Sequence, residues 1–161
     1  MESRRLETAK KFIDHFATLD TQILDTILSE SYVHQFAPAS LKPPGPFSKQ
    51  GFIEHHGHLC NLMTGFPVTA KEYIDSESSN QVTVWATSQA AFRDDVKDEE
   101  TSSTDWAYRG EYIFIFTMDQ TGDKIIRTVE FLDSKETADK LMNLMKRAND
   151  NRSNRHTAVD N

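Results

Sequence analysis

The sequence predicts an α+β fold, in which helices gathered early in the chain pack on a curved antiparallel sheet. Apolar residues at helical spacing mark three early segments, 3–19, 20–30 and 48–65. A short strand is expected between them, at 31–36. Strand alternation then replaces the helical pattern, at 66–77, 82–93 and across 104–134. A helical pattern at 134–148 closes this order, which favours one sheet covered by helices.

Length and charge restrict the class of protein. A chain of 161 residues is long enough to bury a core, and we expect one domain over 1–148. Residues 149–161 lack apolar periodicity and are predicted to be a disordered tail. The net charge of −7 argues against a nucleic-acid partner, since such partners normally require a basic patch.

The sequence shows no pattern of a membrane span, a signal peptide or an intrachain disulfide. No segment approaches the roughly 20 apolar residues of a membrane span, and the N-terminus has no signal-peptide pattern, so we expect no membrane partner and a cytoplasmic location. The single cysteine, Cys60, excludes an intrachain disulfide. The acidic run at 94–105 is typical of a solvated loop.

The segment 104–134 contains the most informative polar residues. It is predicted to be two long strands joined by a turn at 119–123, where Gly122 can adopt a positive φ. Tyr108 and Tyr112 are four residues apart and therefore lie on one face of the first strand. A polar group placed in such an apolar strand must be paired or used.

Glu130, on the second strand, is a candidate general acid or base. Its neighbours Val129 and Phe131 are apolar, and loss of water favours a carboxyl group that exchanges a proton near neutrality. The alternative is a structural carboxylate paired with Arg127 or a lysine. Strand alternation places Arg127 and Asp133 on the opposite face, where they are expected to be structural.

Three further residues are candidates to act together with this carboxylate. Tyr108 and Tyr112 can donate hydrogen bonds to a carbonyl or an enolate oxygen, with aromatic core packing as the alternative. His34 is a candidate general acid–base, because imidazole titrates near neutrality; the alternative is a buried histidine bonded to backbone.

Three residues on other strands are predicted to line the wall of a substrate cavity. Phe36, Trp85 and Thr87 are the candidate substrate-binding residues, with core packing as the alternative for the two aromatic rings. The proline-rich loop at 38–46 is expected to be either the rim of the cavity mouth or a rigid connection.

Motifs for metals and cofactors are missing. His55 and His58 are the only pair in the third helix that could share a ligand, but no acidic partner stands at a matching spacing. His56 continues the apolar stripe and is expected to pack. The chain has no GxGxxG, P-loop, GxSxG or HExxH pattern, so we expect no metal and no cofactor.

Several strings in this order resemble one known group of proteins. They are HQFAPASL at 34–41, GFPVT at 65–69, VWATSQAAF at 84–92, GEYIFIF at 110–116 and IIRTVEFLDS at 125–134. Over residues 3–148 the chain resembles the SnoaL-like branch of the nuclear-transport-factor-2-like superfamily. Within that branch it is similar to small fungal proteins of meroterpenoid, polyketide and indole-alkaloid pathways.

This resemblance implies a cone-shaped α+β barrel, a dimer formed through the outer face of the sheet, and cofactor-free chemistry. A semipinacol-type isomerase of an alkaloid pathway is similar in its paired tyrosines and following glutamate, which correspond to Tyr108, Tyr112 and Glu130. That enzyme also has an arginine near its first strand, whereas this chain has none between Arg5 and Arg93. The meroterpenoid D-ring isomerases of the group are therefore the better comparison.

The sequence thus predicts an isomerase or cyclase that rearranges a hydrophobic polycyclic intermediate of fungal secondary metabolism by acid–base catalysis. Two alternatives stay open. The same cavity suits a dehydratase or lactone hydrolase, and it also suits a non-catalytic ligand-binding or partner subunit. The expected assembly is a homodimer, with a heterodimer with a paralogue as the other possibility.

Overall fold

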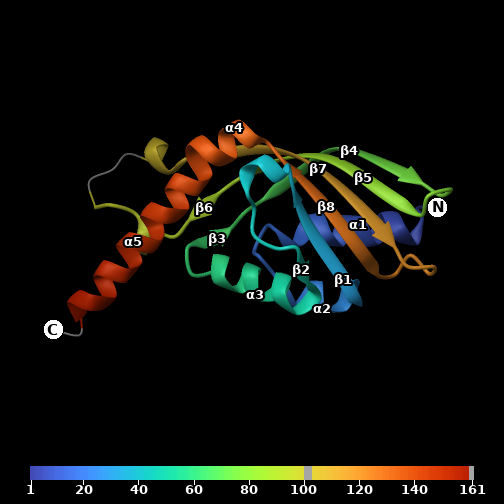
Figure 1. Cartoon of the computed structure of the whole chain (residues 1–161), viewed down its shortest axis with the longest axis horizontal. Coiled ribbons are helices and arrows are strands. Elements are labelled where there is room, and N and C mark those ends of the chain that lie inside the picture. Colours follow the sequence, from blue (N-terminus) through green and yellow to red (C-terminus); the bar gives the residue numbers. More distant parts are fainter. Residues whose placement is uncertain (100–102, 160–161) are drawn as a thin grey trace.

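The computed structural model describes residues 1–99 and 103–159, and within these ranges one sheet of six strands forms the centre of the fold (Figure 1). The strand order across this sheet is β2-β1-β8-β7-β5-β4. Its strands are β1 (Leu28–Ala37), β2 (Phe47–Ser48), β4 (Val68–Ser76), β5 (Gln81–Gln89), β7 (Arg109–Met118) and β8 (Ile125–Leu132). Two short strands, β3 (Met63–Gly65) and β6 (Ala91–Phe92), pair separately.

Helices cover one face of this sheet, here called the inner face. The N-terminal helices are α1 (Arg4–His15), α2 (Thr21–Ile27) and α3 (Lys49–Leu59). Helix α1 packs on β4 and β5, and α3 packs beside β1. Phe12 of α1 anchors the core, because its ring contacts those of Phe52, Phe114 and Phe116 at centroid distances of 4.9 to 6.2 Å.

The predicted α+β class is confirmed, but the sheet is open and mixed. Strands β2 and β4 are its two edges and do not pair with each other, so no closed barrel forms. Strand β1 runs parallel to β8, with Phe36 opposite Glu130, which corrects the expectation of a purely antiparallel sheet. These strands are separated by most of the chain, so no hairpin fixes their relative direction.

The starts of the early helices agree with the sequence, since Ser3, Asp20 and Ser48 cap α1, α2 and α3 as oxygen acceptors. The predicted end of the third helix at Gly65 is wrong. Helix α3 ends at Leu59, and Gly65 belongs to β3. Directly after this strand, the N–H of Phe66 donates a hydrogen bond to the Phe16 carbonyl at 2.8 Å.

The C-terminal segment differs more strongly from the prediction. Asp133 caps the closing helix, because its side chain accepts a hydrogen bond from the N–H of Glu136. A short α4 (Ser134–Glu136) leads into a π-helical turn, η4 (Thr137–Leu141), and then into α5 (Met142–Val159).

The region predicted as a disordered tail is helical up to Val159. Its contacts are polar and so leave no apolar pattern in the sequence. The side-chain amide of Asn151 donates to the Val96 carbonyl at 3.0 Å, and Arg155 donates to the carbonyls of Asp95 and Lys97. Figure 1 shows α5 extending well beyond the sheet.

The predicted hairpin is confirmed as strands β7 and β8, but it is shorter than 104–134, because β7 begins at Arg109 and Tyr108 lies just before it. In its turn Gly122 has a φ of +79°, and its N–H donates to the Asp119 carboxylate at 2.9 Å. The acidic segment 94–105 forms two short 3-10 turns, η2 (Asp94–Val96) and η3 (Ser103–Trp106), while its residues 100–102 lie outside the described ranges. Among the described helices, none combines the length and apolar character that crossing a bilayer requires.

Candidate active site

A cavity of about 310 Å³ opens between the inner face of the sheet, α3 and the C-terminal helices. Most of its wall is apolar, and this is the usual character of a small-molecule site. Its polar groups come from separate elements, namely Lys42 of the proline-rich loop, Tyr112 of β7, Glu130 of β8, His55 and His56 of α3, and Thr137 of the π-helical turn. The apolar residues of the wall include Phe36, Leu59, Phe66, Leu132, Leu141 and Met145.

The proline-rich loop borders this cavity. Leu41, Lys42, Pro43 and Pro44 all line it, so the expectation that this loop forms the rim is supported. Lys42 adopts a left-handed conformation with a φ of +48°, where the chain turns from a short 3-10 segment towards the prolines. The prolines fix the backbone dihedral angles of this part of the cavity wall.

The Glu130 carboxylate lies between the cavity and a buried histidine. Its Oε1 is 3.6 Å from Nε2 of His34, which is completely inaccessible to solvent. Nε2 of His34 has no hydrogen-bond partner within the described residues. A sealed, unpaired imidazole nitrogen beside a carboxyl group is costly unless a proton lies between them.

The other side of His34 fixes its tautomer. Tyr32 donates its hydroxyl proton to Thr128 at 2.8 Å, so its oxygen is left to accept from Nδ1 of His34 at 2.7 Å. Burial raises the pKa of Tyr32, which keeps that proton in place. Nδ1 of His34 therefore carries a hydrogen, and Nε2 is the ring nitrogen that faces Glu130.

The two tyrosines meet through their hydroxyl groups. Oη of Tyr108 and Oη of Tyr112 are 3.0 Å apart, and Ser88 donates to Tyr112 at 2.9 Å. Tyr108 also contacts the Thr137 hydroxyl at 3.5 Å. Tyr112 lines the cavity, whereas Tyr108 lies one hydrogen bond behind it.

Gly110 makes room for this pair of hydroxyl groups. A Cβ atom on Gly110 would overlap both tyrosine hydroxyl oxygens. Burial raises the pKa of Tyr112 and of Tyr108, so both hydroxyls stay protonated and can donate at neutral pH. The pair is thus a neutral hydrogen-bond donor site at the cavity wall.

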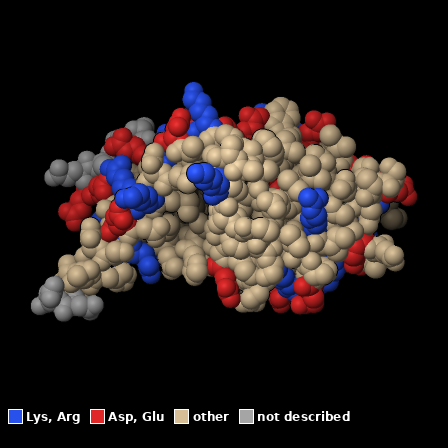
Figure 2. Space-filling view, in the orientation of Figure 1, with Lys and Arg blue, Asp and Glu red and all other residues tan. Residues whose placement is uncertain are grey.

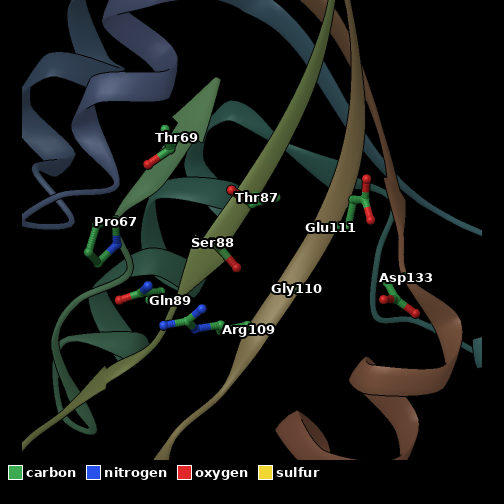
Figure 3. A pocket seen from close by; sticks show the side chains of 9 residues that line it. All are labelled: Pro67, Thr69, Thr87, Ser88, Gln89, Arg109, Gly110, Glu111 and Asp133. Carbon is green, nitrogen blue, oxygen red and sulfur yellow. The ribbon is translucent and has the colours of Figure 1, made fainter. Parts of the chain in front are cut away.

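The predictions for Trp85 and Thr87 do not agree with the structure, because both residues lie on the outer face of the sheet. Trp85 donates its indole N–H to Glu111 at 2.5 Å and is covered by Lys71, whose Nζ lies 4.2 Å from the ring centroid. Thr87 lines a separate polar pocket with Arg109 (Figure 3). In this part of β5 the inner face carries the small residues Ala86, opposite Tyr112 of β7, and Ser88, opposite Gly110.

The remaining predicted residues are placed as follows. Phe36 lines the cavity, as expected. Arg127 is exposed on the outer face of β8, so the alternative in which it pairs with Glu130 is wrong. Asp133 caps α4 and lines the outer pocket. The structure therefore brings together Glu130, His34 and both tyrosines.

The three histidines of α3 differ in their burial. His55 is half-buried at the cavity, His56 is buried and also lines it, and His58 is exposed. No group of three or more metal-ligating side chains that could hold a metal ion occurs within residues 1–99 and 103–159. Burial lowers the pKa of His55 and of His56, which favours their neutral forms.

Comparison with known proteins identifies the fold. No family model and no curated protein matches the sequence. The chain is similar to the solved BvnE pinacolase from Penicillium brevicompactum, at 18% identity and a TM-score of 0.74, over 90% of this chain and 96% of that one. It is also similar to AusH from Aspergillus nidulans, at 23% identity and a TM-score of 0.66, over 81% of this chain and 84% of that one.

A bacterial structure extends the comparison. A SnoaL-like polyketide cyclase from Jannaschia sp. CCS1 has 13% identity and a TM-score of 0.61, over 81% of this chain and 85% of that one. The resemblance predicted from the sequence strings is therefore confirmed at the level of the fold.

Proposed function

We propose that this chain is a cofactor-free isomerase or cyclase that rearranges a hydrophobic polycyclic intermediate of fungal secondary metabolism by acid–base catalysis. The single observation that carries this proposal is the Glu130 carboxyl group, which lines an apolar cavity with Nε2 of His34 behind it at 3.6 Å. Structural likeness to a fungal pinacolase and to a polyketide cyclase supports the choice of a rearrangement or cyclisation.

Glu130 is proposed to move the proton. The pair is proposed to share one proton, which passes between Oε1 of Glu130 and Nε2 of His34 when the two side chains close the 3.6 Å between them. When it lies on Nε2, the carboxylate can remove a proton from a carbon or hydroxyl group of the substrate. When it lies on the carboxyl group, Glu130 can protonate the substrate. The apolar wall excludes water, which would otherwise compete for the same proton.

Tyr112 is proposed to polarise a substrate oxygen. It accepts a hydrogen bond from Ser88, so its own hydroxyl hydrogen remains available to Tyr108 or to a carbonyl group in the cavity. A neutral tyrosine that donates to a developing enolate, together with a carboxylate base, is an established way to isomerise a cyclic ketone. Tyr108 acts through Tyr112 and is a positioning residue.

The proposal is tested by deuterium uptake. Tetracyclic ketones are incubated with the protein in D₂O, and mass spectrometry follows the exchange of hydrogens next to the carbonyl group. Wild type should catalyse the exchange, and Glu130→Gln should slow it by about 10²-fold or more. The matched control is Glu111→Gln, since Glu111 lies on the outer face of β7.

Two outcomes would oppose it. Exchange at the wild-type rate in Glu130→Gln would remove Glu130 from the chemistry. Absence of exchange in the wild type, combined with tight binding of the ketones, would favour the alternative of a non-catalytic binding subunit. Incorporation of ¹⁸O from labelled water into a product would instead favour hydrolysis.

The outer face is proposed to form a homodimer. Trp85, Ile113 and Phe131 are direct neighbours across β5, β7 and β8, and each is at least 36% exposed. Figure 2 shows that the surface over β1 and β8 carries few charges, with acidic side chains gathered towards the edges. An exposed apolar row on a sheet is a common protein-protein contact.

A further inference from the structure

His56 of α3 has no role in the proposed function, although it lines the same cavity. Its ring is buried and packs against Phe52 at a centroid distance of 4.2 Å, so the prediction that it packs is confirmed. Packing accounts for the burial of the ring's carbon atoms. Each of its two nitrogen atoms is a hydrogen-bond donor or acceptor and needs a partner of its own.

One nitrogen belongs to a short chain of hydrogen bonds that starts on α1. The Phe12 carbonyl can only accept, so Nδ1 of His15 carries the hydrogen of that contact. Nε2 of His15 is then an acceptor in the neutral ring. It lies 3.1 Å from Nδ1 of His56, which must therefore donate. The remaining atom, Nε2 of His56, is left with a free lone pair.

Both rings stay neutral in this arrangement. Burial lowers the pKa of His15 to about 4, against the opposing effect of its hydrogen bond to the Phe12 carbonyl. Burial also lowers the pKa of His56, and positive charge on His15, His55 or His34 would lower it further. Nε2 of His56 thus remains a hydrogen-bond acceptor at neutral pH.

This acceptor has no partner within the described residues. Nε2 of His34, which is also unpaired, is sealed inside the protein, whereas Nε2 of His56 is not among the fully buried unpaired atoms. Because the rest of the side chain is buried and lines the cavity, we infer that Nε2 is accessible from the cavity. Tyr112, by contrast, presents a hydrogen-bond donor to the same cavity, its hydroxyl hydrogen.

We propose that Nε2 of His56 binds a hydroxyl group of the substrate, so that the substrate class is a polycyclic hydroxy ketone. The carbonyl group would lie against Tyr112, and the hydroxyl group would donate to His56. This inference rests on the cavity being the substrate site of the proposed function, but it does not require Glu130 to be the acid–base group.

The test compares two compounds of one tetracyclic skeleton, a hydroxy ketone and the corresponding diketone, by isothermal titration calorimetry. Only the hydroxy ketone can donate to Nε2. Wild type should bind it about tenfold more tightly than the diketone, which is the effect of one net hydrogen bond. His56→Phe should bind both compounds equally, while the control His58→Phe, at an exposed position of the same helix outside the cavity, should keep the preference.

A second measurement uses the wild type alone, and so does not depend on the folding of a variant. Long-range ¹H–¹⁵N NMR should show His56 with its hydrogen on Nδ1, and the hydroxy ketone should shift the Nε2 resonance more than the diketone does. Hydrogen on Nε2 would overturn the proposal. So would a preference that persists in His56→Phe, or a wild type that binds both compounds equally or neither.

Glu130→Gln separates this inference from the proposed function. If Glu130→Gln keeps wild-type deuterium exchange while His56→Phe loses the hydroxyl preference, the proposed role of Glu130 fails and the role of His56 stands. If Glu130→Gln abolishes exchange while His56→Phe keeps the preference, the reverse holds.

Discussion

The two faces of β7 and β8 carry different kinds of polar group, although their residues alternate along the same strands. On the inner face, Tyr112 and Glu130 are buried, and each contacts another buried polar side chain. On the outer face, Glu111 and Arg127 are exposed to water. Water screens the outer charges and weakens their interactions, whereas burial strengthens those of the inner groups.

This difference explains why a few inner residues are candidates for chemistry and many outer ones are not. A buried hydroxyl or carboxyl group must be held by specific partners, and the partners also fix where its proton lies. Ser88, Tyr32 and His15 have this supporting role on the inner face. The outer polar pocket in Figure 3 is lined mainly by exposed side chains, such as Gln89, Arg109 and Glu111, and Ser88 is its buried polar member.

Acidification should have the largest effect on stability, and it acts through the inner face. The pKa of His15 is about 4 in the folded chain and near 6.5 when unfolded, so the unfolded state binds more protons between these values. The contribution of neutral His15 to the free energy of unfolding should therefore be fully present above pH 6.5. The free energy of unfolding should fall by up to roughly 3 kcal/mol as the pH approaches 4.

Urea unfolding at several pH values measures this loss. His15→Gln, whose amide oxygen can still accept from His56, should show a smaller loss, while the exposed His58→Gln should behave as wild type. The same acid dependence in all three proteins would contradict the neutral histidine pair.

Gly110→Ala should break the tyrosine arrangement. The new methyl group would overlap both hydroxyl oxygens, so the rings must move, and we expect a loss of about 2 kcal/mol in the free energy of unfolding together with slower deuterium exchange. Gly57→Ala is the matched control. Nothing lies near its Cβ position, and alanine favours the helix, so this change should be neutral or stabilising. Equal effects of the two substitutions would argue against close packing at Gly110.

Tyr112→Phe should slow exchange by about tenfold, the contribution of one hydrogen bond in the transition state, without changing the fold. Tyr108→Phe should have a smaller effect, because Tyr108 contacts Tyr112 and not the cavity. A larger loss in Tyr108→Phe than in Tyr112→Phe would reverse the proposed roles. The rates are compared at saturating ketone, where binding differences do not contribute.

The outer face should affect assembly and leave the chemistry nearly unchanged. Phe131→Ser removes the most exposed member of the apolar row, so analytical ultracentrifugation should show a weaker homodimer, with deuterium exchange per chain close to wild type. A monomeric wild type would contradict the homodimer, and a dimer unaffected by Phe131→Ser would place its interface elsewhere.

Local patterns made much of the fold predictable. The caps Ser3, Asp20 and Ser48 and the turn at Gly122 depend only on neighbouring residues. Strand alternation separated Glu130 from Arg127 correctly, because both lie on β8 and a period of two needs no knowledge of the partner strands. The parallel pairing of β1 with β8 depends on the path of the whole chain and has no local signal.

The same distinction explains the errors at the site. The sequence predicts Trp85 at the cavity wall, but the cavity side of β5 carries small residues there, Ala86 opposite Tyr112 and Ser88 opposite Gly110. The pairing of Ala86 with a large ring depends on the register of β5 and β7, which alternation within one strand does not give. The partner of His56 lies 41 residues away on another helix, so the free nitrogen of His56 was not predictable from the chain alone.

The most direct measurement of the central claim is a crystal structure with a tetracyclic hydroxy ketone bound. We predict the ligand in the inner cavity, with its carbonyl oxygen within hydrogen-bonding distance of Oη of Tyr112 and the hydrogen to be moved facing the Glu130 carboxylate. A ligand bound only to the outer face of the sheet, or one in the cavity with no polar atom near Glu130 or Tyr112, would contradict the account.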